Sequence, residues 1–265
     1  MFFNSPIKYN KSNLIEDFEH AGIKKGDCIL LHSSLSRIGW VNGGAVTVIT
    51  ALLDVLGSEG TLVVPTHSGD NSDPSGWKNP PLPEEWWEKF REEMPAYDAR
   101  TTPTFLMGVI PELLRNWPGA IRSDHPQTSF AAVGPLAKKI TAGHALDCQL
   151  GERSPLARLE EVGAKVMLLG VTFNSCTAFH LAEYRNSPRL DKNRFVAMVD
   201  GSRQWVSVSD ITFEDSDFGE IGCQVMKTGS FKEVSVGATH CWTFSIADAI
   251  STATTWMEAH RNNLA

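Results

Sequence analysis

Residues 28–66, CILLHSSLSRIGWVNGGAVTVITALLDVLGSEGTLVVPT, contain the pattern that decides the fold. The stretch begins and ends with short apolar runs, at 28–33 and 61–66, which are typical of strands buried on both faces. Between these runs, apolar residues in 45–57 recur at helical spacing before a glycine. The order strand, helix, strand predicts an α/β fold in which helices cover a sheet.

Elements of the same kinds are predicted on both sides of this unit. The spacing of apolar residues predicts helices at 12–22 and 83–94. Residues 102–116 predict a helix that breaks near Pro111. Between 66 and 83, glycines, prolines and asparagines predict a long surface loop, which is either functional or disordered.

The second half of the chain extends the pattern. Two further strands are predicted at 128–134 and 165–171, with a helix at 154–163 between them. Helical composition recurs at 177–186 and at 245–260. The α/β sheet therefore continues beyond the first unit.

Asp200-Gly201 joins two extended runs and is the strongest short hairpin signal in the chain. No internal repeat and no linker divides the sequence. We therefore expect residues 1–265 to form a single α/β/α layered domain, with a mixed, largely parallel sheet and an antiparallel C-terminal hairpin.

The composition favours a folded protein with small-molecule partners. Hydrophobic residues make up 42% and charged residues 21% of the chain, as in ordinary globular proteins. The 31 acidic and 24 basic side chains give a formal net charge of -7. This charge disfavours nucleic acid as a partner and can attract a cationic ligand, although it also serves solubility.

The sequence predicts a soluble, cytoplasmic protein without a membrane partner. The first residues, MFFNSPIKYN, lack the basic flank and long apolar region of a secretory signal. No apolar run approaches the roughly 20 residues that a membrane-spanning helix needs. The five cysteines are widely separated and show no CxxC spacing, which argues against a disulfide framework and a cysteine-based zinc site.

His180 and Glu183 form the pair that carries the chemistry. Three enzyme signatures, GxGxxG after a strand, GxxxxGK[ST] and GxSxG, are missing from the chain. The HxxE spacing places both side chains on one face of a helix, where a base and its orienting acid could sit. A surface ion pair involving Arg185 and half of a metal site are alternatives, but HExxH is absent and we expect no metal.

Several segments, taken together and in this order, resemble the aminoglycoside 3-N-acetyltransferase family over nearly the whole chain. They are LHSSLSRIGWVNGG at 31–44, GTLVVPTHS at 60–68, FLMGVIPELLR at 105–115, RSDHPQTSFAAVG at 122–134, GERSPLARL at 151–159, LLGVTFNSCTAFHLAEYR at 168–185 and FEDSDFGEIG at 213–222. The resemblance implies acetyl transfer from acetyl-coenzyme A to an amine, with His180 as the base and Glu183, or another carboxylate, holding its ring.

The resemblance also implies where the cofactor lies. The residues that would meet coenzyme A are His32, Ser33, Ser34, Leu35, Gly43, Gly44, Pro65, Thr66, Thr102, Pro103, Thr104 and Phe105. Several of them follow predicted strands, and open α/β sheets bind ligands at strand exits. Hydroxyls there, as on Ser33 and Thr66, could face the oxyanion of the tetrahedral intermediate.

The acceptor is less defined than the acetyl donor. A cationic aminoglycoside needs carboxylates, and the candidates for substrate binding are Asp70, Asp73, Glu214, Asp215 and Asp217, although solvated acidic turns are an alternative. Asp124 and His125 either organise the site or are structural. A non-aminoglycoside amine as acceptor, and a coenzyme A-binding protein without turnover, remain open, as does the choice between monomer and homodimer.

Overall fold

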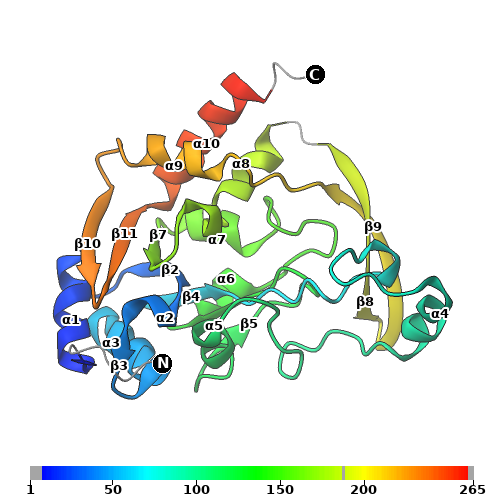
Figure 1. Ribbon diagram of the computed structural model, residues 1–265, viewed down its shortest axis with the longest axis horizontal. Helices are drawn as coiled ribbons and strands as arrows, with labels where there is room; N and C mark the ends of the chain where they lie inside the picture. Colours follow the sequence, from blue (N-terminus) through cyan, green and yellow to red (C-terminus); the bar gives the residue numbers. More distant parts are fainter. Residues whose placement is uncertain (1–7, 187–188, 262–265) are drawn as a thin grey trace.

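The computed structural model describes residues 8–186 and 189–261. A seven-stranded sheet runs through these residues (Figure 1). In their order across the sheet, the strands are β10 (Lys232–Val236), β11 (Thr239–Ser245), β7 (Lys165–Leu169), β2 (Cys28–Ser33), β4 (Thr61–Pro65), β6 (Phe130–Val133) and β5 (Ile121–Arg122). The strands predicted from apolar runs at 28–33, 61–66, 128–134 and 165–171 are all present.

The sheet is mixed, as predicted, but less parallel than predicted. β2 pairs in parallel with β4 and β7, whereas the four other strand pairs in the sheet are antiparallel. The turn between β10 and β11 explains part of the difference, because Gly237 has a φ of 58° and reverses the chain within a few residues. A turn this short can join only antiparallel strands.

Helices cover both faces of the sheet, which confirms the α/β/α layering. The alternation along β2 shows this directly, because Leu30 joins one buried cluster while Ile29 and Leu31 join the other. The first cluster includes residues of α6 (Ala137–Thr141), α7 (Pro155–Glu161), α8 (Phe179–Arg185), α9 (Phe218–Val225) and α10 (Ile246–His260). The second includes residues of α1 (Lys11–His20), α3 (Gly44–Leu56) and α5 (Val109–Leu114).

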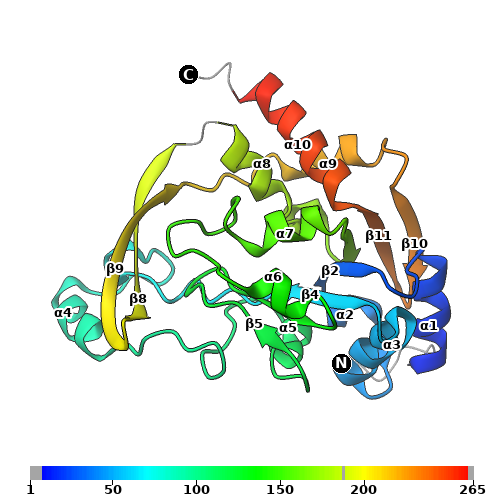
Figure 2. The same cartoon turned by 180° about the vertical axis from the view of Figure 1, so that it is seen from behind.

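The predicted hairpin is present as a separate two-stranded sheet, β8 (Leu190–Val199) and β9 (Ser202–Ile211). Asp200 and Gly201 both have positive φ, as the tight turn requires. Figures 1 and 2 show the hairpin beside α4 (Glu84–Glu93), at the end of the molecule opposite α1 and β10. The Asn71 side chain holds it there, donating to the Val196 carbonyl and accepting from the Val196 N–H, both at 3.1 Å.

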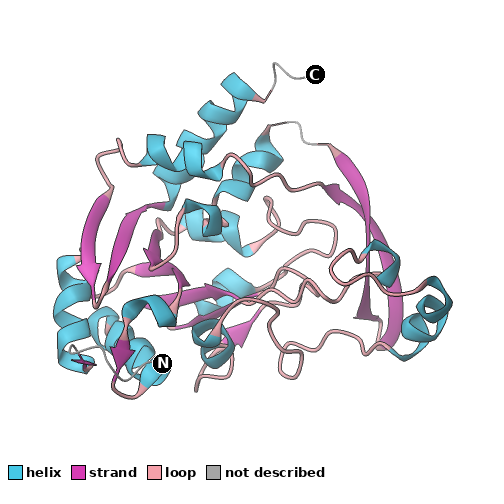
Figure 3. Cartoon of the chain, in the orientation of Figure 1, coloured by secondary structure: helices cyan, strands magenta, loops and turns pink. Residues whose placement is uncertain are grey.

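The predicted helix at 102–116 is much shorter in the structure, where α5 spans only Val109–Leu114. Leu106 and Gly108 adopt φ values of 58° and 86°, which a helix cannot continue through. The Glu112 carboxylate accepts the Thr104 N–H at 2.8 Å and so stabilises an extended entry to α5. Loops of this kind cross the region between the main sheet and the hairpin (Figure 3).

Short elements complete the described chain. They are β1 (Lys8–Tyr9), which pairs with β3 (Trp40–Val41), together with α2 (Leu35–Ile38), η1 (Pro74–Gly76) and η2 (Phe173–Ser175). Within residues 8–186 and 189–261, no helix is both long and apolar enough to cross a membrane. The loop predicted between 66 and 83 contains only η1 as regular structure.

Candidate active site

The centre of the site is a histidine–glutamate pair on α8. His180 Nδ1 donates to Glu183 Oε2 at 2.5 Å, across one helical turn. Both side chains are largely buried, at 12% and 3% exposure, so water screens their attraction little. With Nδ1 occupied, His180 presents Nε2 as the nitrogen that can take a proton. The HxxE spacing therefore brings His180 and Glu183 into contact on one helical face, and their roles as base and orienting acid stay a prediction.

Arg261, just beyond α10, fixes the acid of this pair. Its Nη1 donates to Glu183 Oε1 at 2.7 Å, and its other nitrogens donate to both carboxylate oxygens of Asp217 and to the Glu214 carbonyl. The Glu214 N–H also donates to Glu183 Oε1, at 3.0 Å. With His180 Nδ1, the Glu183 carboxylate therefore accepts from three donors.

Aromatic rings fix the plane of the base. The rings of Phe213 and Phe218 lie 4.5 and 4.9 Å from the His180 ring. On the sheet side, His32 Nε2 lies 3.4 Å from the Thr177 hydroxyl. Burial, and after it the charge of nearby His180, lowers the pKa of His32 to about 3, so this second imidazole stays neutral at physiological pH.

Two cavities meet at His180, and a third shares residues with one of them. We call the first the entry cavity, about 600 Å³, which lies between the end of β2 and the start of α5 and is lined in part by Ser33, Trp40 and Leu106. The second, the central cavity of about 340 Å³, shares Ser33 and Leu106 with the first and reaches His180. The third, the acceptor cavity of about 460 Å³, meets the central cavity at three shared residues, namely His67, Thr177 and His180.

The residues predicted to meet coenzyme A fall into three groups. Six of them line the entry or the central cavity: His32, Ser33, Ser34, Leu35, Gly44 and Pro65. Thr102 and Pro103 line a different cavity, beside Asp70 and Trp77. Gly43, Thr66, Thr104 and Phe105 line none of these cavities.

Thr66 is fully buried and engaged by the protein. Its hydroxyl is 3.0 Å from that of Ser129, and its carbonyl accepts from Arg122 at 2.7 Å. A hydroxyl in this position supports the loop but faces no cavity. A direct contact between Thr66 and a cofactor stays a prediction.

The carboxylates predicted to bind substrate line neither the central nor the acceptor cavity. Asp73 forms ion pairs with Arg91 and Arg194. Burial raises the pKa of Asp73, but hydrogen bonds from Arg91 and Ser75 have the larger effect and hold this pKa well below its ordinary value. Asp217 pairs with Arg261 and so helps to hold the arginine that binds Glu183. Asp70, Glu214 and Asp215 lie elsewhere on the surface, and their role in substrate binding stays a prediction.

The acceptor cavity is instead lined by two carboxylates that sequence reasoning missed, Asp191 and Asp210. They lie directly opposite each other in the β8–β9 register. Like charges directly opposite each other in a strand pair repel. Counting back from the turn at Asp200-Gly201, where Val199 pairs with Ser202, gives this pairing, so the hairpin signal contained the information.

His125 organises the wall of the acceptor cavity. Its Nδ1 accepts the N–H groups of Gln127 and Thr128 at 3.1 Å, and its Nε2 donates to the Leu146 carbonyl at 3.3 Å. Gln127 and Thr128 in turn line the cavity. The structure therefore supports both alternatives for His125, a structural histidine that also shapes the site.

We expect acid to destabilise the protein through His125. Burial lowers its pKa from 6.5 to about 4, so the unfolded chain binds the proton first. The stabilisation is complete above pH 6.5 and is lost as the pH falls toward 4. In denaturant titrations across this window, His125→Asn should reduce the slope of unfolding free energy against pH by up to about 1.4 kcal/mol per pH unit.

Asparagine is chosen because its oxygen replaces Nδ1 as an acceptor but does not titrate. The same substitution at His20, which is exposed on α1, is the matched control. An unchanged slope in His125→Asn would contradict the assignment.

Metal ligation plays no part in the arrangement that the structure describes. Over 8–186 and 189–261, no group of three or more histidine, cysteine, aspartate or glutamate side chains could hold a metal ion. The five cysteines are all free. The described residues place a largely buried histidine where two cavities meet, an arrangement that suits a transferase with two substrates.

Comparisons with known proteins agree with this class. Residues 30–258 match the family model described as aminoglycoside 3-N-acetyltransferase. A prophage-derived aminoglycoside N(3')-acetyltransferase-like protein, YokD of Bacillus subtilis, is 46% identical over 93% of this chain and 91% of its own length. Aminoglycoside N(3)-acetyltransferase IX of Micromonospora chalcea is 36% identical over 94% of this chain and 93% of its own.

Two solved structures extend the comparison to ligands. AAC-IIIb in a binary complex with CoASH is 29% identical and superposes with a TM-score of 0.84, over 96% of this chain and 97% of that one. AAC-VIa bound to sisomicin is 26% identical, with a TM-score of 0.83 over 96% and 98% of the two chains. The chain belongs to the aminoglycoside 3-N-acetyltransferase family of acyltransferases.

Proposed function

We propose that this protein transfers the acetyl group of acetyl-coenzyme A to an amine, with His180 as general base. The observation that carries the proposal is the position of His180 where the central and acceptor cavities meet. An acetyl thioester arriving through one cavity and an amine arriving through the other would meet at its Nε2. Holding two reactants this way can account for a large part of the rate of such a transfer.

The entry and central cavities suit the cofactor. Gly44, the first residue of α3, has a φ of 58° and no neighbouring atom within 4 Å of where a side chain would project, so its backbone is open to the entry cavity. A helix start favours bound phosphate groups. The narrower central cavity, lined by Leu31, Pro65 and Val171 among others, suits the pantetheine arm. The CoASH complex of AAC-IIIb supports coenzyme A as a ligand.

In the transfer, the amine nitrogen bonds to the thioester carbon and the C–S bond breaks. His180 Nε2 takes the proton that the amine loses and returns it to the departing sulfur. Glu183 keeps the ring oriented and offsets the charge of the imidazolium, while Arg261 holds the Glu183 carboxylate in place. Atoms and charge balance, since acetyl-coenzyme A and the amine give an amide and free coenzyme A.

For the acceptor, we propose the 3-amino group of the 2-deoxystreptamine ring of an aminoglycoside, and hence a role in antibiotic resistance. The names of the relatives and the sisomicin complex of AAC-VIa support it. The facing carboxylates Asp191 and Asp210 support a cationic ligand. Other amines are the second candidate, because Asp210 is 3% exposed and already accepts from Tyr184 and Gln149, while Lys192 adds a positive charge.

Release of free thiol from acetyl-coenzyme A, measured against a panel of amines, separates these candidates. We expect thiol release with sisomicin or gentamicin, a product heavier by one acetyl group, and acetylation at the 3-amino position by NMR. Turnover only with singly charged amines would favour the second candidate. Acetyl-coenzyme A binding without turnover on any amine would contradict the proposed activity.

A further inference from the structure

Four buried side-chain atoms in the described residues have no hydrogen-bond partner, and two of them line the cavities at the active site. These two are Ser33 Oγ and His67 Nε2. An unpaired polar atom removed from water costs about 1–3 kcal/mol, so such atoms normally have a partner. Because both residues line connected cavities, a bound ligand can supply the missing partner.

The two atoms differ in where they face. Ser33 is shared by the entry and central cavities, on the path of the cofactor arm. His67 is shared by the central and acceptor cavities, with Thr177 and His180. The acetyl thioester must lie at this second junction if His180 is to take a proton from the attacking amine. His67 therefore lines the space that we propose for the thioester.

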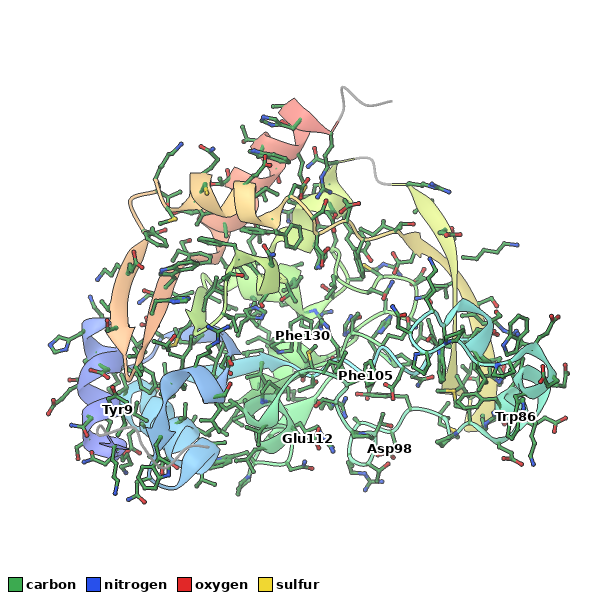
Figure 4. All side chains as sticks on the ribbon, viewed as in Figure 1. Tyr9, Trp86, Asp98, Phe105, Glu112 and Phe130 are labelled. Atoms are coloured by element: carbon green, nitrogen blue, oxygen red, sulfur yellow. The ribbon has the colours of Figure 1, made fainter. Side chains whose placement is uncertain are left out.

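The surrounding structure holds His67 in place. It comes two residues after β4, and its carbonyl accepts the Phe105 N–H at 2.8 Å. Its ring meets the buried Phe130 ring edge-on, with centroids 5.5 Å apart. Figure 4 shows Phe130 and Phe105 close together near the middle of the molecule. A ring held this way is preorganised. Groups that stabilise charge developing in a transition state need such preorganisation.

The charge state of His67 distinguishes a donor from a second base. Burial, and then the nearby His180, His32, His125 and Arg122, lower the pKa of His67 to about 3. The ring is therefore neutral and too weakly basic to compete with His180 for the proton of an ammonium. A neutral imidazole still carries one N–H, and no hydrogen bond in the described residues holds that proton on Nδ1.

We propose that His67 is a further catalytic residue, whose Nε2–H donates a hydrogen bond to the thioester oxygen and to the oxyanion formed from it. The inference rests on the proposed acetyl transfer. As the amine nitrogen bonds to the carbonyl carbon, the π electrons of the C=O bond move to this oxygen, and they return when the C–S bond breaks. His67 keeps its proton throughout, while His180 transfers the proton of the amine.

Two variants test this role by kinetics. His67→Phe keeps a ring against Phe130 but has no N–H, whereas His67→Gln keeps a donor at a similar reach. We expect His67→Phe to lower kcat about 10²-fold, with the KM for acetyl-coenzyme A nearly unchanged, because the bond is strongest in the transition state. His67→Gln should recover most of the loss. Equal kcat in wild type and His67→Phe, or equal losses in both folded variants, would overturn the inference.

A second measurement needs no acceptor. Acetyl-coenzyme A labelled with ¹³C at the carbonyl carbon is bound to the protein, and the C=O stretch is read by isotope-edited infrared spectroscopy. A hydrogen bond to the oxygen lowers the frequency, so we expect a downshift with wild type and His67→Gln that is lost with His67→Phe. A downshift that persists in His67→Phe would refute the donor role while leaving the proposed function intact. If wild type does not bind acetyl-coenzyme A, both proposals fall.

Discussion

His180→Ala should fold and bind acetyl-coenzyme A normally but lose about 10²- to 10⁴-fold in kcat. In the proposed mechanism, Nε2 of this residue takes the proton in the transition state, whereas the entry cavity, where we propose that most of the cofactor binds, lies elsewhere. Thermal unfolding, acetyl-coenzyme A affinity and kcat are measured on one preparation. Alanine at the exposed His20 controls for loss of any histidine.

The alternative interpretation of the HxxE pair, a purely structural ion pair, predicts the reverse pattern. His180→Ala would then lower stability and leave kcat near that of wild type. A folded variant with near-normal kcat would therefore rule out His180 as the base.

Glu183→Gln should lower kcat, but less than His180→Ala does, because the base stays in place while the carboxylate that orients it loses its charge. Glutamine keeps the size of the side chain but removes the charge beside the imidazolium. The protonated ring then loses its proton more readily, so the acid limb of the pH–rate profile should move to lower pH. The measurement is kcat against pH for both proteins.

Glu160→Gln is the matched control for this variant. Glu160 lies on α7 and pairs with Arg185 of α8, and it lines neither the central nor the acceptor cavity. It should leave both kcat and the pH profile unchanged. A Glu183→Gln enzyme whose acid limb stays in place would show that another group balances the charge of the imidazolium.

The sequence predicts the parallel centre of the fold well, because β2, β4 and β7 are buried on both faces and so consist almost wholly of apolar residues. It predicts the 102–116 helix poorly. There, helix-forming residues are overruled by Gly108 and by the bond from Thr104 to Glu112, which forms only in the folded chain. Local propensity cannot anticipate a contact of this kind.

For the site, spacing within one helix found His180 and Glu183 because both positions share one turn of α8. The residues that were missed come from other elements. Arg261 reaches Glu183 from beyond α10, and His67 reaches the same space from the end of β4. The hairpin register could have paired Asp191 with Asp210. Their position in the acceptor cavity depends on how β8 and β9 pack against the core, which the register does not give.

The pairing of Arg261 with Glu183 joins residues 78 positions apart in the chain. On a ribosome, which extends a chain by about 5–20 residues per second, the base and its acid emerge seconds before the arginine that orients them. A translation product that stops between the two contains the whole base–acid pair but leaves its carboxylate without this cation. The pairing of His180 with a fixed carboxylate thus depends on a residue that is synthesised well after both.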